Sequence, residues 1–197
     1  MADQKKKIRK KRFKGQSAGE FTLKTTQVGP PVLLESSFIL GLLDPRDANH
    51  KSVKSVFGFL DPHNCRFHIP AHVFTEVVSK LIQKEKQVSK ALKIIDKFLS
   101  ELHGSLFLGS NPSLEDIMNR YRGLARKRIR FLQSNDFVIA TEGIFQKSLI
   151  LTCDSGMYEK VKKYYPDIYF VATDSRKYKD DIPKFTRRLL AISKKKH

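Results

Sequence analysis

Acidic side chains stand at four points of the sequence where proteins of alternating strands and helices often do chemistry: Glu35, Glu76, Asp136 and Asp154. Glu35 and Asp154 each end an apolar run that predicts a buried strand, whereas Glu76 and Asp136 lie in predicted helices. If the two strands are neighbours in one sheet, Glu35, Asp136 and Asp154 converge at the same edge. Carboxylates gathered in one cleft repel one another, so the cluster is stable only with bound cations. Hard oxygen ligands in an open site favour Mg²⁺ or Mn²⁺.

Each acid also has an ordinary structural interpretation. Asp154 can cap the helix that follows it, and Asp136 suits the positive end of a helix dipole. Glu76 lies off the centre of an apolar helix face, where most glutamates are simply solvated. Glu35 can lie in water if its strand ends at the surface. Taken one at a time, the acids do not decide between structure and chemistry.

Alternating strands and helices position these acids. Strands are predicted at five short apolar runs: 32–35, 65–70, 105–109, 148–152 and 168–172. Helices are predicted from apolar residues at helical spacing: 36–44, 47–61, 71–87, 88–103, 114–131, 134–147 and 155–165. Strands that are apolar throughout and alternate with helices are typical of a parallel sheet covered on both faces. The fold class is therefore α/β.

Lys and Arg outnumber Asp and Glu by 38 to 20, which gives the 197-residue chain a net charge of +18. Much of the excess lies in residues 1–28 and 174–197, which are predicted to be basic arms, disordered when free, because they lack a sustained hydrophobic period. Such a charge indicates a polyanionic partner, most often nucleic acid. The candidate phosphate contacts are Lys5, Lys6, Lys7, Arg9, Lys10, Lys11, Arg12, Arg126, Arg128 and Arg130.

Other roles for the charge stay open. The N-terminal run can be a solubility or nuclear-targeting segment, and an anionic membrane surface is a competing partner. However, no apolar run is long enough to span a bilayer, and no apolar region typical of a secretory signal follows the basic N-terminus. The two cysteines, Cys65 and Cys153, cannot form a disulfide framework, which favours a reducing compartment. We expect a cytoplasmic protein with no membrane partner, or a nuclear protein if the host is a eukaryote.

Four short motifs resemble, in order, those of the PIN-domain family. "VLLESSFILGLLDPRDANHKSV" is similar to the family's opening strand, acid and hydroxyl residue, and "IPAHVFTEVVSKL" to its second motif, in which a helix carries a Glu. "SNDFVIAT" resembles the third motif, an Asp followed by an apolar helix, and "LTCDSGM" resembles the fourth, Thr-x-Asp. The order and the spacings agree from residue 32 to about residue 172.

The resemblance implies a three-layer α/β/α PIN-like domain over residues 29–173, with a mainly parallel sheet of about five strands. It implies an endoribonuclease, nearest in style to the VapC toxins, that hydrolyses RNA phosphodiester bonds with Mg²⁺ or Mn²⁺. The catalytic residues and metal ligands would be Glu35, Glu76, Asp136 and Asp154. The supporting hydroxyls would be those of Ser37 and Thr152. Besides RNA, a cognate antitoxin and a homodimer stay open as partners.

One position departs from the family's pattern. The first acid is usually Asp, whereas Glu35 is longer by a methylene, which moves its carboxylate by about an angstrom. Misplacement on that scale can cost much of a reaction rate. The alternative to an enzyme is therefore a non-catalytic RNA-binding or ribonucleoprotein assembly module that keeps the PIN fold.

Overall fold

The computed structural model describes residues 29–60, 65–102, 106–108, 134–172 and 176–194, together with the single positions 115, 118, 119 and 122. The predicted N-terminal arm, with its candidate contacts from Lys5 to Arg12, lies outside these residues. So do Arg126, Arg128 and Arg130, and most of the helix predicted around them. The roles assigned to those residues therefore stay predictions.

Five short strands of the described chain form one sheet in the order β3-β2-β1-β4-β5, and every neighbouring pair is parallel. The strands are β1 (Pro31–Leu34), β2 (Arg66–Ile69), β3 (Leu106–Leu108), β4 (Leu149–Thr152) and β5 (Ile168–Phe170). Parallel neighbours need crossover connections, which helices supply here. The predicted α/β class and the predicted parallel sheet are confirmed, with small differences at the strand ends.

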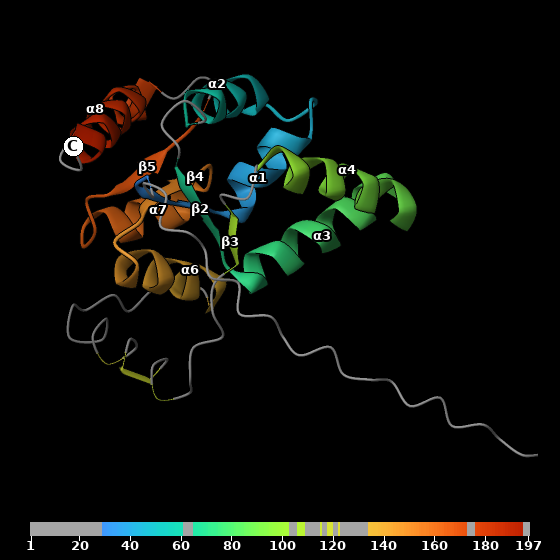
Figure 1. The fold of residues 1–197 in the computed structure, drawn as a ribbon, viewed down its shortest axis with the longest axis horizontal. Coiled ribbons are helices and arrows are strands. Elements are labelled where there is room, and N and C mark those ends of the chain that lie inside the picture. Colours follow the sequence, from blue (N-terminus) through green and yellow to red (C-terminus); the bar gives the residue numbers. More distant parts are fainter. Residues whose placement is uncertain are drawn as a thin grey trace, which may run out of the picture.

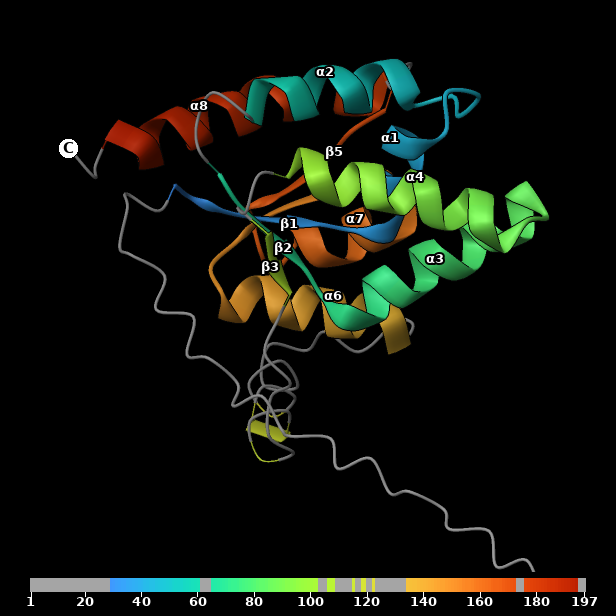
Figure 2. The same cartoon turned by 45° about the vertical axis from the view of Figure 1, so that its right-hand side comes forward.

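Helices cover both faces of the sheet. Those described are α1 (Ser36–Leu43), α2 (His50–Leu60), α3 (Ala71–Glu85), α4 (Val88–Glu101), α6 (Ser134–Phe145), α7 (Ser155–Lys162) and α8 (Asp181–Lys194), with a short 3-10 helix, η2 (Arg176–Tyr178). Helices α2 and α8 lie on one side of the sheet and α6 and α7 on the other, which gives three layers (Figures 1 and 2). β4 is buried over its whole length between them. In the described part of the chain, no helix is both long and apolar enough to cross a membrane.

The C-terminal segment differs from its prediction. Residues 174–197 are predicted to be a free basic arm, but α8 occupies much of this segment and packs on the sheet. Phe185 and Leu189 are fully buried in the core, and the buried Asp181 carboxylate accepts a hydrogen bond from Phe170 N at 3.0 Å. The apolar residues of α8 do recur at helical spacing, but the many charges between them dilute the period. The prediction of a disordered arm is therefore wrong for α8.

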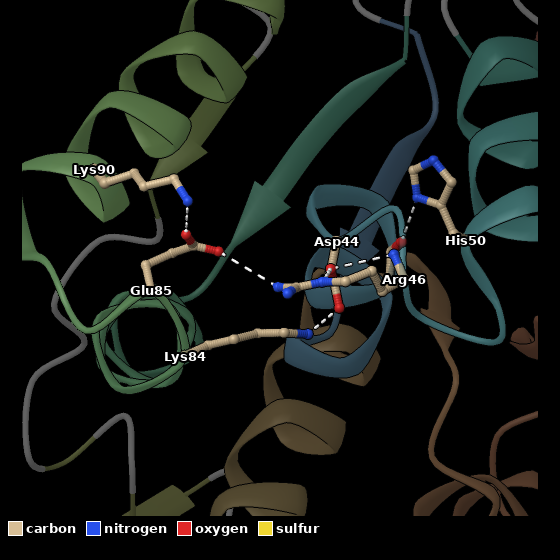
Figure 3. Close-up of polar contacts among 7 residues, drawn as sticks. Asp44, Arg46, His50, Lys84, Glu85 and Lys90 are labelled. Atoms are coloured by element: carbon tan, nitrogen blue, oxygen red, sulfur yellow. Dashed lines mark hydrogen bonds and ion pairs between the residues drawn. The ribbon is translucent and has the colours of Figure 1, made fainter.

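Ion pairs attach the α3–α4 hairpin to the end of α1 (Figure 3). The buried Asp44, which follows the last residue of α1, pairs with Lys84 of α3 and with Arg46, whose Nε lies 3.1 Å from Asp44 Oδ1. Arg46 also reaches Glu85 at 3.6 Å, and Glu85 pairs with Lys90 of α4. The hydrogen bond from Lys90 is the largest of the effects that hold the pKa of the Glu85 carboxyl below its ordinary value. These pairs fix α3 against α1 at the ends of both helices that lie away from the strand tips.

Candidate active site

β1 and β4 are neighbours, as the convergence of the acids requires. They pair in parallel with Leu34 opposite Leu151, and the backbone N–H of Glu35 donates to Leu151 O at 3.1 Å. Glu35 follows β1 directly, and Asp154 follows β4 after one intervening residue. Because parallel strands end at the same edge of a sheet, the two acids share that edge, as the sequence predicts.

Glu35 is buried, and hydrogen bonds occupy both of its carboxylate oxygens. Oε1 accepts a bond from Ser36 Oγ at 2.5 Å. Oε2 accepts bonds from Ser37 N at 2.9 Å, from Ser37 Oγ, and from Thr152 Oγ1 at 3.1 Å. A carboxylate has roughly four acceptor positions, so these four bonds nearly fill its capacity. Glu35 therefore caps α1, and its burial is compensated by protein donors.

Two hydroxyls connect Glu35 to the backbone that follows β4. Ser37 Oγ donates to Glu35 and accepts a hydrogen bond from Cys153 N at 2.8 Å. Thr152 Oγ1 donates to Glu35 and accepts a hydrogen bond from Asp154 N at 2.9 Å. The two hydroxyl oxygens lie 3.5 Å apart. Ser37 and Thr152 are the residues predicted as supporting hydroxyls, and the structure places both against the first acid.

Asp154 caps α7, which is the ordinary role that the sequence allows for it. Its Oδ1 accepts a hydrogen bond from Met157 N at 2.9 Å. The residue is exposed, and its Oδ2 accepts no hydrogen bond from the described part of the chain. Capping thus uses one oxygen of Asp154 and leaves the other available to a further partner.

The side chain of Asp136 makes no hydrogen bond or ion pair with the residues that the structure describes. It lies half-buried in the first turn of α6. Burial is the main cause that raises the pKa of its carboxyl, and the charges of Asp154, Glu35 and Glu76 raise that pKa further. Lys160 of α7 acts in the opposite direction. The charges of all three other predicted acids thus act on the carboxyl of Asp136.

Glu76 reaches the site from α3 and has a cationic partner. Its Oε1 lies 2.5 Å from Lys80 Nζ, one turn further along the helix. Glu76 has the weakest effect of the three acids that raise the pKa of Asp136.

The four acids are coupled, but they are not gathered at ligand distance. Within the described ranges, no three His, Cys, Asp or Glu side chains are close enough together to hold a metal ion. Coulomb coupling acts over longer distances than metal ligation, so this finding and the raised pKa of Asp136 are consistent. The structure therefore shows a cluster of acids along one edge, with three of them turned toward protein partners.

Two further side chains contribute at this edge and are not predicted from the sequence. Ser36 donates the hydrogen bond to Glu35 Oε1, although as a helix-start serine it looks like an ordinary cap. Lys160 is the cation that lowers the pKa of Asp136. It is one of several lysines in and after α7, and nothing in the sequence separates it from the others.

The likeness of this chain to known proteins lies in its fold. No protein-family model and no curated protein matches the sequence. A chain of VapBC2 from Rickettsia felis, solved bound to a DNA fragment from its promoter, matches with a TM-score of 0.51 and 16% identity, over 70% of this chain and 95% of its own. VapC20 from Mycobacterium tuberculosis, a toxin that cleaves the sarcin–ricin loop, matches with a TM-score of 0.50 and 15% identity, over 65% of this chain and 93% of its own.

Sequence identities this low show that the fold is shared, but the activity has to be argued from the residues of the site. Both neighbours are matched over nearly their whole length, so the likeness extends over a complete domain and not over a single motif. Together with the parallel sheet and the acids at its carboxyl edge, it shows that this chain has a VapC-like PIN-domain fold.

Proposed function

We propose that the chain is a metal-dependent endoribonuclease that hydrolyses RNA phosphodiester bonds at the carboxyl edge of β1 and β4. The observation that carries this proposal is Asp136, a half-buried carboxylate without a partner among the described residues, with a pKa raised first by burial and then by three other acids. A bound cation would relieve that repulsion. A titratable group whose pKa is perturbed by burial and by neighbouring charges is typical of functional sites. The VapC-like fold supports the same activity by analogy.

The donor set fits a hard divalent cation. Asp136 and the free Oδ2 of Asp154 offer carboxylate oxygens, which favour Mg²⁺ or Mn²⁺ over softer metals. These two residues would hold the ion directly. Glu35 has little acceptor capacity left for the ion, because both of its oxygens accept hydrogen bonds, whereas Glu76 is engaged through Oε1 alone, by Lys80. When bound, the cation would supply neutralisation of phosphate charge and a more acidic water.

The protein's own groups have separate tasks in this proposal. The donors Ser36, Ser37 and Thr152 hold the Glu35 carboxylate in one orientation. Thr152 also accepts from the backbone N–H of Asp154 and so fixes the start of α7. Lys160 places a positive charge near Asp136, where it can contact a phosphate of the substrate.

RNA also needs cations beyond the site, and the net charge of +18 supplies them. The basic N-terminal segment and the cluster Arg126, Arg128 and Arg130 are proposed as backbone contacts. By analogy with the VapBC2 complex, a cognate antitoxin is proposed as a protein partner.

Glu35 supports the second candidate, a non-catalytic RNA-binding or ribonucleoprotein assembly module. Its carboxylate accepts four hydrogen bonds from the protein, so little of its acceptor capacity is left for a metal ion. In that case the basic surface would bind RNA, and the acids would serve as helix caps and ion-pair partners.

Cleavage of a labelled RNA in Mg²⁺ or Mn²⁺, with and without excess EDTA, tests the proposal. We expect the parent to cleave only with metal. Asp154→Asn should lose more than the roughly 10–100-fold that removal of an outer-shell group costs a metal enzyme. Because Asn caps helices about as well as Asp, this variant should unfold at nearly the same urea concentration as the parent.

Asp154→Ala is the control for the cap. It loses the hydrogen bond to Met157 N and should be less stable by about 1 kcal/mol. A parent protein that is as inert as Asp154→Asn on a broad set of RNAs, with either metal, would favour the binding module over the enzyme.

A further inference from the structure

A cavity of about 500 Å³ opens between α3 and the start of α6 (Figure 2 shows the two helices side by side). Its lining residues are His72, Thr75, Glu76, Ser79, Lys80, Gln83 and Asn135. Pockets for small ligands in proteins have volumes of about 300–1,000 Å³. The cavity is therefore large enough for one nucleotide and too small for a folded partner.

The side chains that line the cavity all carry a polar group, and their total charge is close to zero. Five of its seven residues carry an amide, a hydroxyl or an imidazole, and none is an aliphatic hydrophobic residue. The two charged members, Glu76 and Lys80, pair with each other at 2.5 Å. Amide and hydroxyl groups are those that hydrogen-bond to the edges of bases, and an imidazole can stack on a base.

The cavity adjoins the candidate active site. Glu76 lines the cavity and also raises the pKa of Asp136, while Asn135 is the residue directly before Asp136. Gln83 lies seven residues beyond Glu76 on α3, about 10 Å further along the helix axis. A strand whose phosphate lies at the acids would therefore have a neighbouring nucleotide within reach of Ser79 and Gln83.

We propose that this cavity holds one nucleotide of the RNA, next to the bond that is cleaved, and that Gln83 contributes a hydrogen bond to its base. The assignment of the nucleotide to an RNA substrate rests on the proposed ribonuclease function. The binding of a nucleotide in the cavity rests only on the residues that line it. An experiment can therefore contradict one without contradicting the other.

Binding of the four 5′-ribonucleoside monophosphates, followed by the amide chemical shifts of residues 72–83, tests the cavity without any need for catalysis. We expect at least one nucleotide to shift these amide signals. Its affinity should be lower by about tenfold or more in Gln83→Ala, which is the loss expected when a bidentate contact between an amide side chain and a base is removed. Gln87→Ala is the matched control, because Gln87 is also exposed but lies outside the cavity and makes no side-chain cap bond to α4. It should bind as the parent does.

Absence of shifts with all four nucleotides, or equal affinities in the parent and Gln83→Ala, would overturn the proposal. Cleavage of an RNA library with one randomised stretch gives the second readout. Gln83→Ala should lose base preference at one position beside the cleaved bond while it still cleaves, and an unchanged preference would count against the cavity. If the parent binds a nucleotide through Gln83 but cleaves nothing, the ribonuclease function fails and the nucleotide site stands.

Discussion

Glu35 and Asp154 both cap helices, and they differ in what capping leaves free. The donors around Glu35 engage both of its oxygens, whereas Asp154 uses Oδ1 for α7 and leaves Oδ2 without a donor in the described chain. A cap and a metal ligand are therefore compatible in Asp154. In Glu35 they compete, because both oxygens already accept hydrogen bonds that compensate a buried charge.

Asp136 should destabilise the metal-free protein at neutral pH. Its carboxyl has a pKa raised above 3.8 in the folded state, so the folded state binds that proton more tightly than the unfolded state. The free energy of unfolding then falls as the pH rises from 3.8 through the raised folded pKa. In EDTA, Asp136→Asn should therefore be more stable than the parent at pH 7 and should lose this advantage below pH 3.8.

Urea unfolding at both pH values, with EDTA and with Mn²⁺, measures this difference. Mn²⁺ should stabilise the parent by mass action and stabilise Asp136→Asn much less. Asp96→Asn, at an exposed position of α4, is the matched control and should show neither effect. If the parent in EDTA at pH 7 were as stable as Asp136→Asn, neither burial nor the neighbouring carboxylates would destabilise the charged form of Asp136.

The positions of the acids can be predicted from the sequence, but their hydrogen bonds cannot. Glu35 and Asp154 follow apolar runs, and the α/β class places such residues at one edge. The donors to Glu35 come partly from Thr152, 117 positions away, and this contact exists only once β1 and β4 are paired. The same is true of Lys160, whose effect on Asp136 depends on how α6 and α7 lie against β4.

At the scale of elements, α6 can approach β4 closely because it has a glycine at the contact. A Cβ built on Gly143 would lie 2.4 Å from Ile150 Cδ1 and 2.6 Å from Ile150 Cγ1, and real Cβ atoms do not come that close to a neighbour. This contact sets the distance between the helix that carries Asp136 and the strand that leads to Asp154. A side chain at 143 therefore requires Ile150 to leave its present position or the two elements to move apart.

Gly143→Ala should therefore cost about 1–3 kcal/mol of stability, the usual cost of overpacking a core. Gly58→Ala in α2 is the control, because no atom would lie within 4 Å of a Cβ added there. It should gain about 0.5–1 kcal/mol from the better helix former. Ile150→Val should recover part of the loss in Gly143→Ala, since it removes the atom in the shortest contact. Equal stabilities of the two alanine variants in urea unfolding would contradict this account of the interface.

The element that the sequence does not predict, α8, is fixed by contacts across the fold. The ring of Phe185 packs edge-on against that of Tyr169 at 5.3 Å, and Arg188 forms two hydrogen bonds with Asp167, at 3.0 and 2.9 Å. Each partner lies near β5 and 16 to 21 positions earlier in the chain. A local pattern rich in charges shows no sign of them, whereas the strands, apolar at nearly every position, can be predicted from local sequence alone.

At the scale of the whole molecule, an acidic edge lies within a strongly basic chain. The acids around Asp136 repel a phosphate backbone, so the net charge of +18 has to attract RNA from elsewhere on the surface. Because α8 is part of the folded domain, its Lys and Arg residues are fixed on the surface and do not belong to a free arm. The N-terminal segment is then the remaining candidate for an arm that contacts RNA outside the site.

Deletion of residues 2–14 removes eight Lys and Arg residues and tests that arm. If these side chains bind phosphates, affinity for a single-stranded RNA should fall, and the slope of log K against log salt should become shallower by about 0.7 for each phosphate that is no longer neutralised. Deletion of residues 15–27 is the matched control, because it removes the same number of residues with one Lys and one Glu and so no net charge. Its salt slope should equal that of the parent.

Both deletions should leave cleavage of a short substrate at low salt intact, because the acids and their donors lie at residue 35 and beyond. Equal slopes for the two deletions would instead make the basic segment a targeting or solubility element.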